Sequence, residues 1–136
     1  MDGIIFDVDG TLWDSVEVVA DSWNLAIKEN SDLEPNLNRE ILQGLFGKTM
    51  DEIAAGVFPD LDPDSRRKLM DICFDYENRY LETHPGVYYE GVMDTLKELA
   101  LEYPLFIVSN CQCGYIEVMM KGAGMEPYIK DFLCFG

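Results

Sequence analysis

The sequence predicts an α/β protein with an incomplete, doubly wound parallel sheet of three strands and a block of helices inserted after the first strand. Short apolar runs at residues 3–8, 105–110 and 132–135 lack polar alternation, which is typical of strands covered on both faces in a parallel sheet. Helical periodicity fills the segments between these runs. The order of strand, inserted helices, helix, strand, helix and strand indicates an interrupted α/β architecture.

The first strand gives way to a helix at residue 15. Asp14 or Ser15 is the expected N-cap, because short polar side chains accept hydrogen bonds from the free amides at a helix start. The apolar residues that follow recur on one helical face. They are Val16, Val19, Ala20, Trp23 and Ile27.

Three further helices are expected in the insert. Two short ones cover residues 38–46 and 49–57, on either side of a break at Gly47. A longer one opens at 62–65, where Asp-Pro-Asp-Ser combines an N-cap with a proline in the first turn. The segment 15–84 is therefore expected to be helical throughout.

After the insert the chain returns to the α/β pattern. His-Pro-Gly at 84–86 predicts a turn, and residues 91–102 form an amphipathic helix that leads into the second strand. A further helix stops at the glycines within 122–124 and leads to the third strand.

Composition and charge limit the classes of function. A chain of 136 residues that is 48% hydrophobic can bury one core. It carries 10 basic and 26 acidic residues, a net charge of −16. This charge argues against nucleic acid and against an anionic membrane surface as partners, because both bind through lysine and arginine. Such a chain needs a metal ion or a local cluster of donors to handle phosphate.

The four cysteines do not form a disulfide framework in this interpretation. The chain opens with no basic leader, and its longest apolar runs are far shorter than the ~20 residues that span a bilayer, so we expect a cytoplasmic protein. The spacing of Cys111 and Cys113 resembles a metal or redox pair. A zinc site needs about four ligands, however, and His84 is the only histidine. Oxidation of these thiols, beside the second strand, is a hypothesis that the sequence leaves open.

The residues that carry chemistry follow the first strand directly. Asp7 and Asp9 are two apart, so in an extended chain their carboxylates point the same way, ~6.6 Å from each other. Open α/β sheets bind ligands at the carboxyl ends of their strands. A phosphoryl group fits beside two such carboxylates, with one as nucleophile and the other as proton donor. Gly10 permits a sharp turn, and Thr11 adds a hydroxyl and an amide.

These residues resemble the first motif of the haloacid dehalogenase superfamily of phosphohydrolases. Residues 4–12 are IIFDVDGTL, and residues 13–15 are WDS, as in the phosphoglycolate phosphatase and phosphoglucomutase-like branch. The resemblance implies a Rossmann-like core in which Asp7 is the nucleophile that becomes an aspartyl phosphate. It also implies that Asp9 is the acid/base, and that Mg²⁺ is held by the Asp7 carboxylate and the Asp9 backbone carbonyl.

The second strand resembles the second motif of the same family, an apolar strand that ends in serine or threonine. The resemblance implies that Ser109 hydrogen-bonds the phosphate, with help from the Asn110 amide and the next helix start. The helical insert, 15–84, resembles the small cap of the family, which leaves 1–14 and 85–136 as core. By the same resemblance, Lys48 is a candidate substrate contact, because it falls in the loop where such caps often carry a substrate-facing residue. A solvated surface lysine is the alternative.

Two family motifs are not found in this chain. Family members continue to a lysine that neutralises the phosphate and to a fourth strand with acidic Mg²⁺ ligands, whereas the sequence ends at Gly136. Two aspartates and a phosphate dianion bring about −4, Mg²⁺ offsets two of these charges, and a proton on Asp9 leaves about −1. Without the lysine we expect a weak or inactive phosphatase. Clear Mg²⁺-dependent turnover of p-nitrophenyl phosphate by the purified chain, abolished by Asp7→Asn, would contradict this expectation of weak or absent activity.

The same resemblance predicts an exposed sheet edge. In the family the first strand is central, with the second and third strands on one side. Residues 4–8 would then form an apolar edge that can pair with another chain. We expect either self-association through this edge or a natural protein longer than this chain.

The expected function is Mg²⁺-dependent hydrolysis of a small phosphorylated metabolite. A phosphomutase is the nearest alternative, because it uses the same two aspartates and differs in the acceptor of the phosphoryl group. A non-catalytic interaction module is a second alternative, in which the aspartates are relics. The long insert after the first strand argues against a response-regulator receiver. The residue types alone do not predict the substrate.

Overall fold

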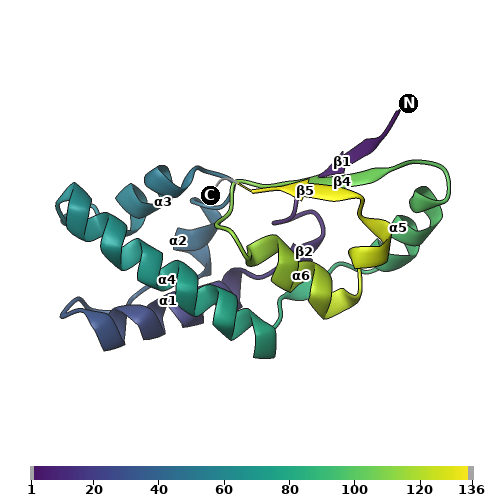
Figure 1. Ribbon diagram of the computed structural model, residues 1–136. Helices are drawn as coiled ribbons and strands as arrows, with labels where there is room; N and C mark the ends of the chain where they lie inside the picture. The colour runs from purple at the N-terminus through teal and green to yellow at the C-terminus, as the bar shows by residue number, and fades with distance from the viewer. Residues whose placement is uncertain (1, 135–136) are drawn as a thin grey trace.

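Three parallel strands form the core sheet of the computed structural model, which describes residues 2–134. β1 (Ile4–Phe6) pairs with β4 (Leu105–Val108), and β4 pairs with β5 (Asp131–Leu133), so the strand order is β1-β4-β5 (Figure 1). The second and third strands of the predicted sheet therefore lie on one side of the first, as expected. Phe135, the expected end of the third strand, lies outside the described residues.

Only one face of this sheet is covered in the described residues. Leu105 and Ile107 are at most 1% exposed and face α5 (Val92–Ala100) and α6 (Tyr115–Ala123), which lie on the same side of the sheet (Figure 1). The other face exposes apolar side chains: Ile5 is 68% exposed, Leu133 66% and Val108 44%. The prediction that the first strand is covered on both faces is therefore wrong for this structure. An apolar run reports a preference for burial, but it does not specify what covers each face.

The expected exposed edge is confirmed in the described residues. β1 pairs with β4 alone, so the backbone on its other side is unpaired within the sheet. Pairing of this edge with another chain stays a prediction.

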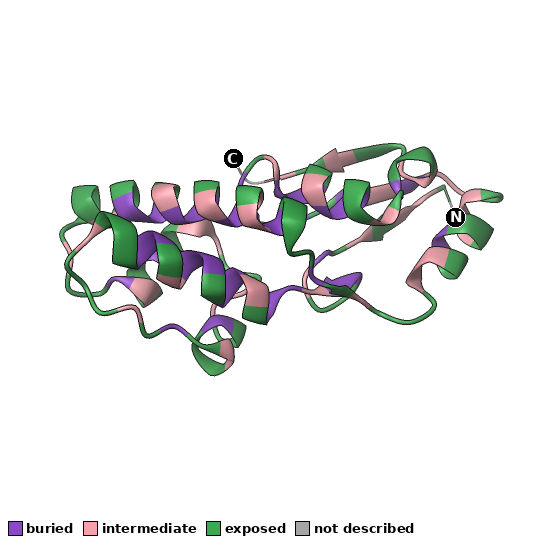
Figure 2. Ribbon diagram, turned by 90° about the horizontal axis from the view of Figure 1, so that it is seen from below, coloured by how far each residue is buried: buried purple, intermediate pink, exposed green. Residues whose placement is uncertain are grey.

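Four helices form the insert, as the periodicity predicts. They are α1 (Val16–Asn30), α2 (Arg39–Gln43), α3 (Met50–Val57) and α4 (Pro63–Thr83). α1 and α4 lie side by side, and Figure 2 shows their buried faces turned toward each other. Their apolar stripes meet the shorter helices in one cluster, in which Val19, Ala26 and Cys73 are fully buried. The insert thus has a hydrophobic core of its own.

The helix starts follow the capping signals. The Asp62 side chain accepts a hydrogen bond from the Ser65 amide, and Pro63 occupies the first turn of α4. At α1 both expected residues take part in the cap. Ser15 occupies the N-cap position, and Asp14 Oδ1 accepts the hydrogen bond from the Val16 amide, at 3.1 Å.

A short ribbon joins the insert to the sheet region and was not predicted. β2 (Trp13–Asp14) pairs antiparallel with β3 (Val87–Tyr88), so both connections run side by side. Two residues per strand are too few for a periodic pattern. The ribbon brings Gly86 against the first connection, where a Cβ atom would lie 2.9 Å from both the Asp14 carbonyl oxygen and Trp13 Cε3.

Gly86→Ala is therefore expected to lower the free energy of unfolding by about 1–3 kcal/mol, because the added methyl must push the two connections apart. Gly44→Ala is the matched control: its Cβ would lie 3.6 Å from the nearest atom, in helical backbone. Urea denaturation of both variants tests this, and equal stabilities would contradict it.

The remaining elements complete the second cluster. α6 packs on the sheet through Ile116 and Met119, both fully buried, and Gly124 ends it in a left-handed conformation. A 3-10 turn, Glu126–Tyr128, leads to β5. In residues 2–134 no helix combines the length and apolar character needed to cross a membrane.

Candidate active site

The loop after β1 turns sharply and presents two aspartates. Val8 is fully buried, and its backbone carbonyl oxygen accepts hydrogen bonds from the amides of Thr11 and Leu12, at 3.1 and 2.9 Å. Gly10 takes a φ of +76°, which favours glycine, and its amide donates to the Trp13 carbonyl. The turn leaves Asp7 exposed and Asp9 partly buried beside it.

Two cavities bring the predicted site residues together. One, of about 260 Å³, is lined by Asp7, Asp9 and Gly10; the other, of about 240 Å³, is lined by the same aspartates with Ser109 and Asn110. The carboxyl ends of β1 and β4 therefore meet at one place, as parallel strands require.

Two of the predicted residues lie outside these cavities. Thr11 is exposed, and its amide donates to the Val8 carbonyl within the turn. Lys48 is exposed and lines neither cavity, whereas its neighbour Gly47 lines both. A substrate contact by Lys48 stays a prediction.

The loop after β4 holds the insert and the core together. The Ser109 amide donates to the Leu133 carbonyl, at 3.1 Å, which extends the pairing of β4 with β5. The side-chain amide of Asn110 donates to the Gly47 carbonyl, at 3.1 Å. The Asn110 side chain is therefore already hydrogen-bonded to the insert. Ser109 is buried at the edge of the 240 Å³ cavity.

Asp9 lies in a hydrogen-bonded, partly buried environment. The Tyr115 hydroxyl donates to Asp9 Oδ1. Trp13 Nε1 donates to the same hydroxyl at 3.1 Å, and Ser15 Oγ lies 2.8 Å from it. Burial raises the pKa of Asp9 to about 6; the nearby charge of Asp7 adds to this, and the Tyr115 hydrogen bond opposes it. Asp9 can therefore hold or release a proton near neutral pH.

Tyr115→Phe is expected to raise the pKa of Asp9 further, by about 1–2 units, because a hydrogen bond to a charged group contributes about 1.5–3 kcal/mol. The pH titration of the Asp9 carboxyl carbon, followed by NMR, measures this shift. Tyr128→Phe is the control, since Tyr128 lies in the 3-10 turn before β5 and lines none of the cavities that hold Asp9. An unchanged titration in Tyr115→Phe would contradict the prediction.

A buried glutamate on α4 faces the same region and was not predicted. Glu77 is 3% exposed; its Oε1 accepts from Trp23 Nε1 at 2.8 Å and its Oε2 from Gln112 Nε2 at 2.6 Å. Burial raises the pKa of Glu77 to about 8; the Gln112 hydrogen bond opposes this, and the charge of Asp9 adds to it. A helical spacing of four from Cys73 was the available signal, since it places this acid on the buried stripe.

Glu77 and Asp9 line one small cavity between the insert and the core. Its volume is about 30 Å³, room for a group of only one or two heavy atoms. Aromatic rings of Trp23, Phe46 and Phe74 form part of its wall.

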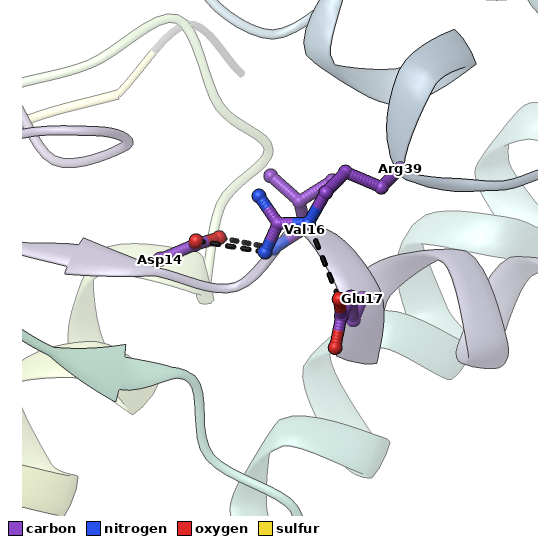
Figure 3. A network of polar contacts seen from close by, with 4 residues as sticks. All are labelled: Asp14, Val16, Glu17 and Arg39. Atoms are coloured by element: carbon purple, nitrogen blue, oxygen red, sulfur yellow. Dashed lines mark hydrogen bonds and ion pairs between the residues drawn. The ribbon is translucent and has the colours of Figure 1, made fainter.

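Arg39 is the second functional candidate that the sequence did not predict. Its Nη2 lies 2.8 Å from Asp14 Oδ2, and its Nε lies 3.2 Å from Glu17 Oε1 (Figure 3). Burial raises the pKa of Asp14, but the hydrogen bonds from Arg39 and from the Val16 amide outweigh burial and hold this pKa below its usual range. Arg39 also lines the 260 Å³ cavity, where it is the one cation among the described lining residues.

The donor set fits a magnesium ion. Mg²⁺ prefers oxygen ligands and is usually held by one or two carboxylates, together with waters and substrate phosphate. Asp7 offers an exposed carboxylate, and no backbone amide of the described loop donates to the Asp9 carbonyl. Residues 2–134 contain no group of three or more histidine, cysteine or acidic side chains placed to hold a metal ion.

The fold is shared with several solved structures, described as a phosphatase or as hydrolases. A predicted phosphoglycolate phosphatase from Haemophilus somnus superposes with a TM-score of 0.85 at 22% identity, over 99% of this chain and 63% of that one. A haloacid dehalogenase-like hydrolase from Streptococcus pneumoniae gives 0.78 at 21% identity, over 98% and 61%. A magnesium-bound hydrolase from Bacillus subtilis gives 0.62 at 22% identity, over 98% and 64%.

The chain spans about three fifths of the length of these structures. No curated protein matches it in sequence. A family model for haloacid dehalogenase-like hydrolases matches residues 4–135, which include both candidate motifs and the whole helical insert. The protein therefore belongs to the haloacid dehalogenase-like hydrolase family.

Proposed function

We propose that the protein is a Mg²⁺-dependent phosphohydrolase of small phosphorylated metabolites that acts through a phosphoryl group carried on Asp7. The observation that carries this proposal is the cavity of about 240 Å³ in which Asp7 and Asp9 meet Ser109. Membership of a hydrolase family supports it. The free cysteines fit a reducing compartment, so the proposed location is the cytoplasm.

Each aspartate has a separate step in the proposed reaction. The exposed Asp7 carboxylate attacks phosphorus, and Asp9 gives its proton to the leaving oxygen as the phosphorus–oxygen bond breaks. Asp9 then takes a proton from a water molecule that attacks the phosphoryl group on Asp7; the bond between phosphorus and the Asp7 oxygen breaks, inorganic phosphate leaves, and the Asp7 carboxylate is regenerated. Bound Mg²⁺ supplies positive charge that offsets the phosphate and Asp7. The pKa of about 6 lets Asp9 act as acid and then as base.

Tyr115 and Ser109 support these steps without exchanging protons. The Tyr115 hydroxyl fixes one Asp9 oxygen, so the other oxygen remains for the leaving group. Ser109 lines the same cavity as both aspartates, which supports the proposal that its hydroxyl holds a phosphate oxygen.

The lack of an unpaired cation among the described residues around the site points to the kind of leaving group, because a second anionic group would have no positive partner there. The cavity between the insert and the core carries Glu77 and Asp9 and no cation among its described lining residues. Arg39, in the larger cavity, is already paired with two acids. We therefore expect small, uncharged leaving groups to be preferred over those with a second anionic group.

The described residues that line these cavities include no lysine. We therefore expect slow turnover, because one missing electrostatic stabiliser costs roughly 3–4 kcal/mol in the transition state.

The test is phosphate release from matched monoesters with and without Mg²⁺. Ethyl phosphate and glycerol phosphate represent uncharged leaving groups, and phosphoglycolate represents an anionic one. We expect Mg²⁺-dependent release that is faster for the uncharged group. Isomerisation of a sugar phosphate without phosphate release would contradict the proposal and indicate a mutase.

A further inference from the structure

Two of the four cysteines lie in contact at the edge of the candidate active site. Cys113 lies in the loop between β4 and α6, and Cys134 directly follows β5. Their Sγ atoms are 3.2 Å apart, and both thiols are free. Figure 1 shows the loop before α6 beside the carboxyl end of β5. The sulfurs therefore need to approach by about 1 Å to reach the ~2.05 Å of a disulfide.

We propose that Cys113 and Cys134 form a reversible disulfide, which makes the loop after β4 a site of oxidation by hydroperoxides. The proposal rests on the geometry of this pair and does not require the proposed hydrolysis. It assigns a role to residues that the phosphoryl-transfer steps leave unused.

The backbone around both cysteines is already held in place. The Ser109 amide donates to the Leu133 carbonyl, so the loop after β4 starts beside the strand end that carries Cys134. The Cys113 carbonyl accepts a hydrogen bond from Asn78 Nδ2 of α4, at 2.9 Å. The pair is therefore close because neighbouring contacts fix both segments, and ring closure requires mainly a rotation of the two side chains.

The environment distinguishes this pair from the other two cysteines. Cys113 is exposed, and Cys134 is partly exposed, so an oxidant can reach them. Cys73 and Cys111 are buried, and burial raises the pKa of each thiol to about 12, which keeps them protonated and unreactive. Cys113 is the more exposed of the two thiols, so it is the first that a hydroperoxide reaches.

The chemistry balances with a hydroperoxide as the two-electron oxidant. The Cys113 thiolate attacks the peroxide oxygen; a sulfur–oxygen bond forms, the oxygen–oxygen bond breaks, and the hydroxide that leaves becomes water with the proton lost by Cys113. Cys134 then attacks the sulfenic sulfur; the disulfide forms, the sulfur–oxygen bond breaks, and a second water leaves with the proton lost by Cys134. Two thiols and one hydrogen peroxide thus give one disulfide and two waters. A dithiol reverses the change by exchange.

The disulfide would fix the loop after β4, which contacts α4 of the insert. Gln112 and Cys113 both bind α4, through Glu77 and Asn78. Ser109 and Asn110 lie in the same loop. Oxidation would therefore restrict the movement of this loop relative to α4.

The experiment compares the whole chain before and after treatment with one equivalent of hydrogen peroxide. Unfolded samples are labelled with N-ethylmaleimide and weighed by mass spectrometry. We expect four labels on the reduced protein and two on the oxidised protein, with a peptide that links Cys113 to Cys134. The melting temperature should rise by roughly 5–10 °C, because the bond closes a loop in the unfolded chain. Dithiothreitol should reverse both changes.

Variants at the other cysteines provide the control. Cys111→Ser should retain the linked peptide, whereas Cys113→Ser and Cys134→Ser should each lose it. The wild-type label count is decisive even if a variant fails to fold. Four labels after oxidation, a link through Cys73 or Cys111, or links only between chains would each overturn the proposal.

Discussion

Asp7→Asn is expected to lower the slow phosphate release of the wild type by at least about 10³-fold, because an amide cannot serve as the nucleophile that takes up the phosphoryl group. The replacement is nearly the same size, and Asp7 is exposed, so the fold should survive. Single-turnover assays with p-nitrophenyl phosphate and Mg²⁺ measure the effect, together with mass spectrometry of the peptide that contains residue 7. We expect the phosphorylated peptide in the wild type and none in the variant.

Two companion variants make this result specific. Asp2→Asn removes another exposed carboxylate just before β1 and should leave phosphate release unchanged. Asp9→Asn should behave differently from Asp7→Asn, because p-nitrophenolate leaves without a proton. It should still form the phosphopeptide but hydrolyse it slowly, since the base for the second step is gone. Normal turnover in Asp7→Asn would rule out the proposed nucleophile.

The two motifs were predictable because each is contiguous in the chain. Asp7 and Asp9 follow an apolar strand directly, and Ser109 follows another, so the rule for strand ends in parallel sheets brings them together. No information about long-range packing was needed beyond the order of the strands.

The supporting residues could not be predicted in this way. Glu77, Arg39 and Tyr115 lie on three helices, and each is one position in an ordinary amphipathic pattern. The positions of Glu77 and Arg39 depend on how the insert packs against the core, and that of Tyr115 depends on how α6 packs on the sheet. The ribbon of β2 and β3 sets the placement of the insert, and its strands are too short to leave a periodic signal.

The protein is expected to lose stability as the pH rises from about 5 to 8, and Glu77→Gln should remove most of this loss. The pKa of Glu77 is about 4.5 in an unfolded chain and is raised to about 8 in the folded one, so the folded state retains a proton that the unfolded state releases. The contribution is complete below pH 4.5 and fades as the pH approaches 8. Its size is on the order of 3–5 kcal/mol.

Urea denaturation at several pH values between 5 and 8 tests the linkage. With each pH unit, the free energy of unfolding of the wild type should fall by up to ~1.4 kcal/mol more than that of Glu77→Gln. The amide group introduced by Glu77→Gln retains only one of the two hydrogen bonds, from Trp23 or from Gln112, so at pH 5 the variant should be less stable by about 1 kcal/mol. The two stability curves should therefore cross within this range.

Glu82→Gln is the matched control for this crossing, because it removes an exposed carboxylate from the same helix. Its stability should follow wild type at every pH. Asp9 contributes a loss of the same sign, but mostly below pH 6, because its pKa is raised only to about 6. A difference that persists between pH 6 and 8 therefore belongs to Glu77. If Glu77→Gln ran parallel to wild type over that interval, the buried glutamate would already be ionised in the folded protein, and the insert would close over a charge at neutral pH.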